Sequence, residues 1–586
     1  MKEVKDYSKN NIFQTFISIF PVHYFSFVAQ CLGNMINGLF VGNYLSNLDM
    51  SAIGFYNPFT TIIFIFTTII TAGARILCGR YIGKGQKEKI NETYTIAIHS
   101  IFVCGLVLSL LSIFLSSPLA KLLGASGIAL SSTKSYMISV GLGILPSMLA
   151  SCLIVFLQIN NKSRYTFISA LLLAVCNFGF DFICVKVFTP SIFAIGLCNS
   201  LSQLVTFIFV LCVFKKNKTT LRIIKTKDSG ILKDIVSLGL PLAFFNIMIA
   251  LRNIVFNRAT MASGGENAIS GLAILNSSVA PFDGVSVAIT TVSTMLASIY
   301  CGEKDRASIR QLYKISVLFG EALTILRLII IILFTSNIAS LFGASKEVIA
   351  YAKDLYLFAG IGMPINILII PIMSVYQSLG KTMHCNILYF VSVLLANVFC
   401  SYYLSIYYGV NGVWFGYVLQ EIVNLAGAYI LSCIRRKKVV MSIDDILFYD
   451  NDLDVGKHIT ISITNPGDII YVSRKIESYC VARGVEKKRA MYSGLCLEEI
   501  TSNIFEHGFA SSKKKNKTVD IYCDVDDDTN EVNIRVKDNG VAFDPYIKIN
   551  ENSDAMCNVG LKIVSKLSKN MNYQNNFGLN VLTIDL

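Results

Sequence analysis

Charged side chains are scarce in this chain of 586 residues. Asp, Glu, Lys and Arg make up 15% of it and hydrophobic residues 53%, whereas an average soluble domain has about 25% charged residues. The mean hydropathy is +0.58. This composition excludes an ordinary soluble protein and indicates an integral membrane protein.

Ligand patterns for metals are also missing. The chain has only 5 histidines, and its 16 cysteines are scattered, mostly through apolar runs, without a C-x-x-C pair. A zinc site needs closely spaced Cys or His ligands, so the spacing excludes one and favours free, buried thiols.

The basic excess is confined to the first three quarters of the chain. Residues 441–586 hold 17 Lys and Arg against 22 Asp and Glu, which leaves 34 against 16 in residues 1–440. The net charge of +13 thus divides into +18 and −5. Because the basic residues lie between apolar runs, the cytoplasmic-loop bias of membrane proteins explains them, and no nucleic acid partner is expected.

Twelve apolar stretches are long enough to cross a bilayer as helices, which takes about 20 residues. The first is too long and too rich in Asn and Gly for a cleaved signal peptide. Alternate loops carry the Lys and Arg residues, which predicts that both termini are cytoplasmic. The stretches are residues 12–42, 51–80, 92–118, 132–158, 166–190, 192–214, 236–262, 268–300, 309–336, 348–378, 385–408 and 410–434.

The membrane part repeats itself at a nearly constant spacing along the chain. This spacing spans six helices, an even number, so the two halves have the same orientation. A parallel repeat of this kind is typical of transporters, with binding sites expected between the halves. The matched positions are Tyr81 with Tyr300, Gly83 with Gly302, Gly124 with Gly343, Gln158 with Gln377, Lys162 with Lys381 and Asn177 with Asn397.

Asp181 and Asn177 lie one helical turn apart in the fifth stretch. An acid at bilayer depth is costly and therefore often functional. A buried carboxylate suits the binding of a proton or, together with carbonyl oxygens, of Na⁺. The alternative is a structural acid that hydrogen-bonds a neighbouring helix.

Further polar residues inside the stretches are candidates for a substrate cavity, although such residues also join helices by hydrogen bonds. Arg75, Arg252 and Arg327 lie in the same stretches, so some of the acids are expected to be paired. The candidates are Gln30, Asn34 and Asn37 in the first half and Asn246, Asn253, Asn257, Asp283 and Gln377 in the second.

Motifs over residues 10–435 resemble the multidrug and toxic compound extrusion (MATE) transporters. The resemblance implies two helical bundles that open alternately to either side and export organic cations or drugs in exchange for Na⁺ or H⁺. It also implies that Asp181 and Asn177 form a cation site in the N-terminal bundle. The motifs are Pro21, the run Ile36 to Gly42, the loop Gly83 to Gly85, Gln158, and Asn177 with Asp181.

Two positions depart from that family's pattern. Asn37 stands where many relatives have Asp, and Asn199 stands where they often have Thr. Asparagine can bind Na⁺ but cannot titrate. Cation coupling is therefore expected to depend on Asp181, with Asn37 and Asn199 as neutral members of the site.

After Lys438 the sequence reads as one soluble α+β domain, for which about 140 residues suffice. Apolar alternation predicts strands at residues 457–463, 519–525 and 531–537, and helical spacing predicts helices at about 468–483, 487–508 and 560–570. The expected division is an N-terminal bundle (1–225), a C-terminal bundle (226–438), a linker (439–454) and the soluble domain (455–586).

Three segments of this domain can combine into a nucleotide site. One helix face carries three polar residues at i, i+4 and i+8. A strand ends in an Asp-Asn-Gly turn, and a later Gly opens a helix whose N-terminus favours phosphate. Each alone also fits a surface helix face, a hairpin turn or a helix start. The residues are Glu499, Asn503, His507, Asp538, Gly540 and Gly560.

In this order the segments resemble the boxes of the histidine-kinase-like ATPase superfamily, most closely its anti-sigma-factor serine kinases. The resemblance implies a two-layer α+β sandwich that binds ATP and Mg²⁺. It assigns Glu499 as the base, Asn503 as the Mg²⁺ ligand and Asp538 as the partner of the adenine amine. His507 belongs to the first box, Gly540 permits close approach, and Gly560 lies by the phosphates.

Asn558 replaces the Gly that usually begins the last box, and Ala542 replaces a second Gly, which favours ATP binding over turnover. A kinase activity would need a small cytoplasmic Ser- or Thr-bearing protein as substrate. The basic run from Lys513 to Lys517 fits a solvated loop, or one that contacts anionic membrane lipid.

The leading interpretation is an inner-membrane antiporter with a cytoplasmic ATP-binding regulatory domain. A second makes the membrane half a ligand sensor whose output is the kinase or partner-switching activity of the tail. A third keeps export but gives it a lipid-linked or anionic substrate, helped by Arg75 or Arg252.

Overall fold

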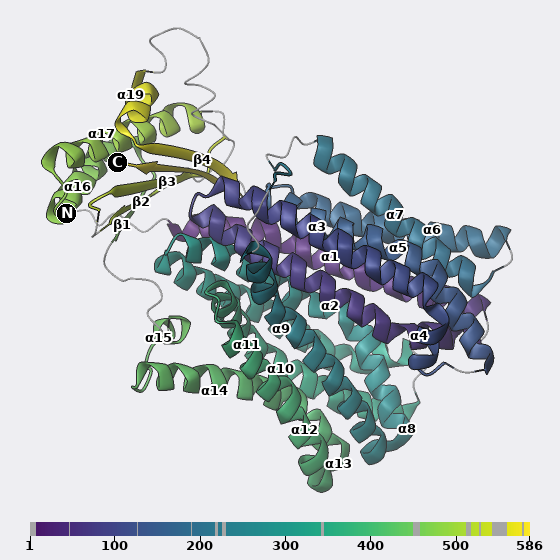
Figure 1. Ribbon diagram of the computed structural model, residues 1–586. Coiled ribbons are helices and arrows are strands. Elements are labelled where there is room, and N and C mark those ends of the chain that lie inside the picture. The colour runs from purple at the N-terminus through teal and green to yellow at the C-terminus, as the bar shows by residue number, and fades with distance from the viewer. Residues whose placement is uncertain are drawn as a thin grey trace.

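The computed structural model describes residues 8–45, 47–125, 127–188, 190–216, 221–225, 230–341, 345–448, 458–510, 517–526, 529–541, 559–576 and 579–586. A large helical part carries a smaller domain, built around one sheet, against one end of its helices (Figure 1). Within the described residues, twelve helices are long and apolar enough to cross a membrane, which confirms the expected number of spans.

The first half of the helical part holds six of these spans. The short helix α4 connects two of them, and the spans pack into one bundle (Figure 1). Its helices are α1 (Ser8–Tyr44), α2 (Asn47–Gly83), α3 (Lys87–Phe114), α4 (Ser116–Leu122), α5 (Gly127–Ile159), α6 (Arg164–Val187) and α7 (Ile192–Lys216).

The second half holds the other six spans in a second bundle. Its first helix merges two spans and breaks at Gly265, and the span from Thr382 to Trp414 includes two π-helical segments. Its elements are α8 (Gly230–Gly302), α9 (Arg306–Leu341), α10 (Lys346–Ser378), α11 (Thr382–Tyr389), η1 (Phe390–Leu395), α12 (Ala396–Phe399), η2 (Cys400–Leu404), α13 (Ser405–Trp414) and α14 (Gly416–Arg436).

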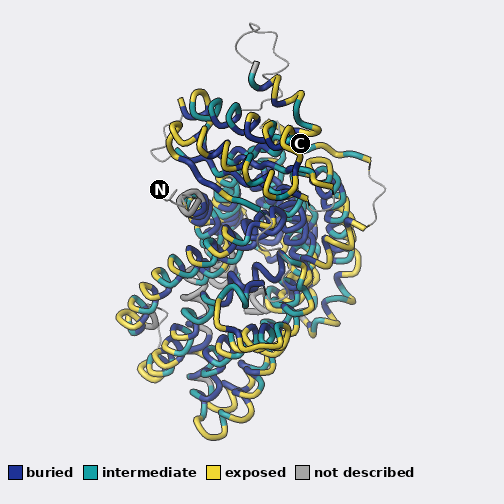
Figure 2. Tube along the Cα trace, turned by 90° about the vertical axis from the view of Figure 1, so that its left-hand side faces the viewer, coloured by how far each residue is buried: buried dark blue, intermediate teal, exposed yellow. Residues whose placement is uncertain are grey.

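Many large apolar side chains of these helices are exposed, as a lipid-facing surface requires. Phe64 is 54% exposed, Val103 58% and Leu333 67%. Figure 2 shows exposed positions along the outer helices and buried ones where the helices meet. The helical part therefore has the surface of an integral membrane protein.

The backbone reproduces the sequence repeat in its turns. Gly85 and Lys304 both have positive φ angles, of 72° and 58°, in the turns that follow α2 and α8. Asn161 and Gly380 form a second such pair, with φ angles of 59° and 79°, after α5 and α10. The two halves thus share their turn geometry as well as their helix order.

The two halves touch backbone to backbone where α2 and α8 end. A methyl group on Gly83 would overlap the carbonyl oxygen of Ile299, and one on Gly302 would overlap that of Arg80. Arg80 also donates from Nε to the carbonyl of Ser378 at 2.6 Å. Two glycines at equivalent positions of the repeat therefore bring the two halves into contact at the end of the helical part that faces the soluble domain.

The segment expected as a linker contains a helix that packs on the second half. This helix is α15 (Ile443–Leu447). Tyr376 donates to the carbonyl of Ile446 at 2.8 Å, and Arg310 donates from Nε to Asp444 at 2.7 Å. Phe448, which follows, is fully buried. The helical part therefore extends to Phe448.

The soluble domain is a two-layer α+β sandwich, as expected from the sequence. In the described part of this domain, five antiparallel strands lie in the order β1-β2-β3-β5-β4, and the helices cover one face of the sheet (Figure 1). The elements are β1 (His458–Ile463), η3 (Pro466–Asp468), α16 (Ile469–Ala482), α17 (Lys487–Asn503), η4 (Ile504–Gly508), β2 (Val519–Val525), β3 (Val532–Asp538), α19 (Val559–Leu567), β4 (Asn570–Asn576) and β5 (Leu579–Asp585).

The sheet separates an apolar face from a polar one. Ile521, Val536 and Leu582 are cross-strand neighbours and belong to the core under the helices. Tyr522, Arg535 and Thr583 form the adjacent row. Because successive residues of a strand point to opposite faces, this row lies on the face that the helices leave uncovered.

We expect Gly83→Ala to destabilise the protein by about 1–3 kcal/mol, because the new methyl group must displace backbone across the contact between the halves. The measurement is the midpoint of thermal inactivation in detergent. Gly54→Ala, in the same helix with nothing within 4 Å of the added methyl, is the control and should not destabilise. Equal midpoints for the two variants would refute the contact.

Candidate functional site

The soluble domain has a small cavity between its helices and the end of β3. It is lined by Asn503 of α17, Asp538 of β3 and Leu561 of α19, together with apolar side chains such as Ile500 and Leu582. Members of all three predicted boxes therefore meet at one place. The apolar walls suit a flat aromatic ring, and the two polar side chains suit its polar edge and a metal ion.

Asp538 is held in a fixed orientation at this cavity. Its side chain is only 5% exposed. Oδ1 accepts hydrogen bonds from the Gly540 backbone at 2.7 Å and from Asn580 Nδ2 at 2.8 Å. A buried carboxylate with this geometry is an acceptor suited to a base amine, as the adenine contact requires.

Asn580 is not among the residues predicted from the sequence, yet it organises this side of the cavity. Besides Asp538 it donates to the Val541 carbonyl at 3.0 Å, and its Oδ1 accepts from Tyr573 and Asn575, both at 2.7 Å. Its position in β5, opposite Asp538, follows from a strand pairing that the sequence does not reveal.

Gly540 meets its expected requirement for close approach. A methyl group there would lie 2.6 Å from the carbonyl oxygen of Gly508, and the Val541 backbone donates to that same carbonyl at 2.9 Å. The Asp-Asn-Gly turn is therefore pinned against the end of η4.

Glu499 of α17 and Gly560 of α19 lie in contact with each other, and neither lines the cavity. A methyl group on Gly560 would overlap Glu499 Oε2. Burial raises the pKa of the neighbouring Cys496 thiol to about 12, so this thiol stays neutral. The base and the phosphate box of the resemblance are thus neighbours.

The cavity is too small for ATP in this conformation. It measures about 40 Å³, whereas pockets for ligands of that size measure roughly 300–1,000 Å³. Gly560 rests against Glu499, so α17 and α19 are closed on each other at this point. His507 lies exposed in η4 and does not line the cavity, while Ala542 and Asn558 lie outside the described residues.

Asp181 occupies a buried position in the first bundle. Its side chain is 0% exposed, and neither carboxylate oxygen has a hydrogen-bond partner within the described parts of the chain. Asn177, one turn earlier, is 5% exposed. Tyr136 of α5 and Cys198 of α7 lie close enough to interact electrostatically with the carboxylate. The acid therefore sits among three helices with capacity for a cation.

The remaining predicted residues of the first half are two cation-site members, Asn37 and Asn199, and two substrate-cavity candidates, Gln30 and Asn34. Asn199 is half-buried on α7, and Gln30 is exposed on α1. The side chains of Asn34 and Asn37 lie outside the described residues. The ring of Phe40, one turn after Asn37, lies 5.7 Å from that of Phe178, which places this part of α1 beside Asn177.

The predicted cavity residues of the second half differ in their surroundings. Asp283 pairs with Arg327 at 3.1 Å. Gln377 is buried and donates to the carbonyl of Leu238 at 2.8 Å, and Asn246 donates to its own helix at 2.7 Å. Asn253 and Asn257 are exposed on α8.

A buried polar network, only partly foreseen, connects four elements of the second half. Gln420 of α14 accepts from Arg252 at 3.2 Å and from Asn397 at 2.9 Å. Glu421 accepts from Gln420 at 2.7 Å and from Asn366 at 3.0 Å. Asn397 is the repeat partner of Asn177, so the network lies where the second half mirrors the Asp181 region.

Comparison with family models separates the two parts of the chain. The model described as MatE matches residues 23–183 and 241–403. The model described as Histidine kinase-like ATPase domain matches residues 464–586. The two MatE segments fall in equivalent parts of the two halves, in agreement with the repeat.

Curated relatives match the helical part. The Probable multidrug resistance protein YoeA of Bacillus subtilis is 22% identical over 430 residues, which cover 69% of this chain and 89% of that protein. The Probable multidrug resistance protein NorM of Thermotoga maritima is 24% identical over 437 residues, covering 71% and 91%.

Solved structures share the fold of this part. An outward-facing multidrug resistance MATE family transporter of the MOP superfamily superposes with a TM-score of 0.66 at 19% identity, over 72% of this chain and 97% of that one. A MOP superfamily transporter from Pyrococcus furiosus gives a TM-score of 0.64 at 19% identity, over 71% and 94%.

We expect Asn580→Ala to weaken ATP binding roughly tenfold, because Asp538 loses a buried partner worth about 1–3 kcal/mol. Calorimetry with Mg²⁺ and ATP on the full-length protein measures this. Asn570→Ala, at the other end of the β4–β5 pair, removes an exposed hydrogen bond to Asp585 and serves as the control. Unchanged affinity in Asn580→Ala would show that Asp538 is not the nucleotide contact.

Proposed function

Because the chain belongs to the MATE family of multidrug transporters and carries a histidine-kinase-like ATPase domain, we propose that it is a cation-coupled antiporter under nucleotide control. It exports small organic cations in exchange for Na⁺ or H⁺. The soluble domain binds ATP with Mg²⁺ and regulates this export.

The observation that carries the transport proposal is Asp181. A buried carboxylate without a hydrogen-bond partner among the described residues is costly unless it takes up a proton or a cation. In the second half, by contrast, Glu421 and Asp283 already have amide or guanidinium partners. The coupling ion is therefore assigned to the first bundle, at Asp181 and Asn177, with Asn37 and Asn199 as further members.

The orientation proposal follows from the position of the soluble domain. It lies against one end of the helices (Figure 1) and contacts Gly85 in the turn after α2. Basic residues surround this turn, namely Arg80 in the last turn of α2, Lys84, and Lys87 at the start of α3. Basic loops are retained in the cytoplasm, where ATP is also available. We therefore place both termini in the cytoplasm and the protein in the cytoplasmic membrane.

For the soluble domain we propose ATP binding as the regulatory event. Asn503 and Asp538 fit the roles of Mg²⁺ ligand and adenine contact, since both line one cavity, and Glu499 fits the role of base, since it contacts Gly560 of the phosphate box. Bound Mg²⁺ would neutralise phosphate charge there. A serine-kinase activity would need a Ser- or Thr-bearing cytoplasmic protein as acceptor.

The sensor interpretation remains the second candidate because the soluble domain contacts both halves of the helical part directly. A chain that ends after Phe448 separates the two functions and keeps α15 in place. We expect this truncated chain still to lower drug accumulation in cells, at an altered rate. If neither the full chain nor the truncated one moves any compound, the sensor interpretation replaces the transporter.

We expect Asp181→Asn to reduce transport to background, because the amide cannot exchange a proton and binds a cation more weakly. Efflux of a fluorescent organic cation from cells or proteoliposomes measures the effect. Asn37→Asp should be tolerated, since it adds a titrating group where many relatives have one. Transport at the wild-type rate in Asp181→Asn would remove Asp181 from the mechanism.

A further inference from the structure

The uncovered face of the sheet does not face solvent throughout. We call it the outer face and define it by the cross-strand row Tyr522, Arg535, Thr583 and Asn572, together with Lys537, which lies two residues along β3 from Arg535 on the same face. These side chains are polar or charged, unlike the apolar row under the helices. Parts of this face lie against the helical part of the chain.

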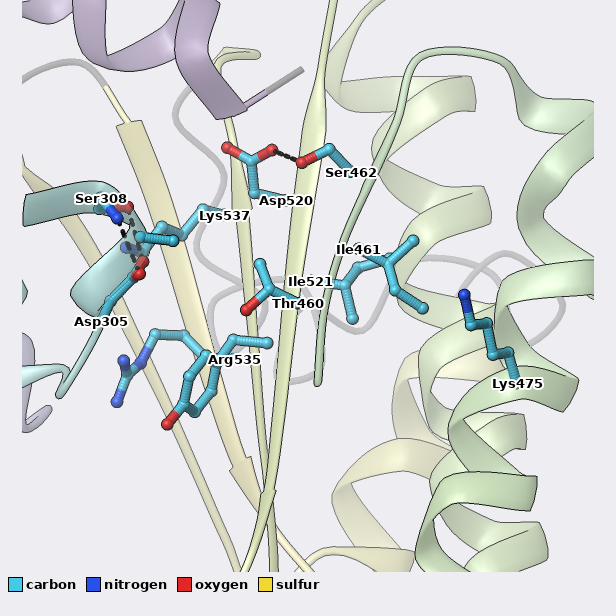
Figure 3. A pocket seen from close by; sticks show the side chains of 12 residues that line it. Asp305, Ser308, Thr460, Ile461, Ser462, Lys475, Asp520, Ile521, Arg535 and Lys537 are labelled. Carbon is cyan, nitrogen blue, oxygen red and sulfur yellow. Dashed lines mark hydrogen bonds between the residues drawn. The ribbon is translucent and has the colours of Figure 1, made fainter. Parts of the chain in front are cut away.

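One set of contacts joins the outer face to the second half. Lys537 forms an ion pair with Glu303, in the turn after α8, and its ammonium group lies 5.3 Å from the centre of the Tyr300 ring. Arg535 Nη1 donates to the Glu303 carbonyl at 3.5 Å. Glu303 is only 3% exposed, so this pair is shielded from solvent. Figure 3 shows Arg535 and Lys537 directed toward this turn.

A second set joins the same face to the first half. Asn572 of β4 donates from its side chain to the carbonyl of Gly85, in the turn after α2. Thr583 of β5 lies beside the same glycine, with its hydroxyl 3.9 Å from where a methyl group on Gly85 would be. One sheet therefore holds a turn from each half.

These two turns are equivalent positions of the repeat. Gly85 and Lys304 correspond to each other in the two halves and share the same left-handed backbone. Each turn directly follows the glycine, Gly83 or Gly302, at which the halves touch. The sheet consequently bridges the halves where they must separate if the transporter opens at this end.

The interface has the character of a contact that can be released. Its bonds are polar or ionic, and a cavity of about 350 Å³ remains beside them, lined by Asp305, Ser308, Asp520 and Lys537 (Figure 3). Interfaces between domains that move are typically polar and less tightly packed than a core.

We propose that the outer face of the sheet is an intramolecular clasp, which holds the two halves together at the end facing the soluble domain. The clasp holds Glu303 through Lys537 and Arg535 and holds Gly85 through Asn572. Separation of the two halves at this end requires the clasp to release one of the two turns. This inference rests on the proposed function in so far as transport involves alternate opening of the two halves.

Cys301 reports on the clasp in the intact chain. It is 9% exposed and lies between Tyr300 and Gly302, beside the contact between the halves. Separation of the halves would expose its thiol. The rate of its alkylation by N-ethylmaleimide in nanodiscs, followed by mass spectrometry of the Cys301 peptide, therefore measures opening and needs no transport substrate.

Lys537→Glu should raise this rate about tenfold, because attraction to Glu303 becomes repulsion and the loss of a charged hydrogen bond shifts an equilibrium by that order. The exchange Lys537→Glu with Glu303→Lys should restore the wild-type rate. Asn572→Asp, which turns a donor into a carboxylate facing the Gly85 carbonyl, should raise the rate although it acts on the other half.

Lys487→Glu is the matched control, because it makes the same charge change at an exposed site in the first turn of α17 and should leave the rate unchanged. A wild-type rate in Lys537→Glu overturns the proposal. So does a raised rate that the charge exchange fails to lower. If Asn572→Asp leaves the rate unchanged, the domain is anchored to the second half alone and does not bridge the halves. Failure of transport in any of these proteins would bear on the proposed function and not on the clasp.

Discussion

At Gly83 and Gly302 the two halves meet without side chains between them, and the arrangement of the remaining parts depends on this contact. The contact holds the C-terminal end of α2 against that of α8, so the turns that follow the two helices lie at the same end of the helical part. One rigid sheet can reach both turns only because they lie together there. The same contact makes the bundles converge near the soluble domain, and they diverge from each other at the far end (Figure 1).

The two halves of the repeat have similar backbones but differ in the positions of their buried acidic residues. Asn177 and Asn397 are equivalent and buried, but Ser401 stands at the position that corresponds to Asp181. The second half obtains its acid from Glu421 on another helix and satisfies it with amide donors. Two halves that share one shape therefore differ in their polar contacts. Among the described residues Asp181 of the first half has no hydrogen-bond partner, whereas Glu421 of the second half joins helices through amide donors.

Periodicity predicts what depends on local pattern. The twelve spans and three of the strands follow from the sequence because apolar spacing determines them. Strands β4 and β5 are not among the predicted strands. The Asn-rich sequence of β4 offers only Met571 and Tyr573 as apolar residues. The position of Asn580 in β5, opposite Asp538, depends on the pairing of β3 with β5. Likewise α15 falls in the expected linker. Ser442 caps its start, but five residues are too short for a periodic pattern, and its packing depends on contacts from Arg310 and Tyr376. Motif order identifies the nucleotide boxes, but only tertiary structure shows how closely Gly560 and Glu499 approach.

Strand β3 places Lys537 and Asp538 side by side in sequence and on opposite faces of the sheet, and β4 does the same with Asn572 and Tyr573. Adjacent Cα atoms are about 3.8 Å apart, so a tilt of either strand is shared by both faces. Coupling of this kind is reciprocal: if nucleotide favours one arrangement of the halves by some factor, that arrangement favours nucleotide by the same factor. Transport of substrate through the membrane would then change the fraction of the protein's soluble domains that have ATP bound.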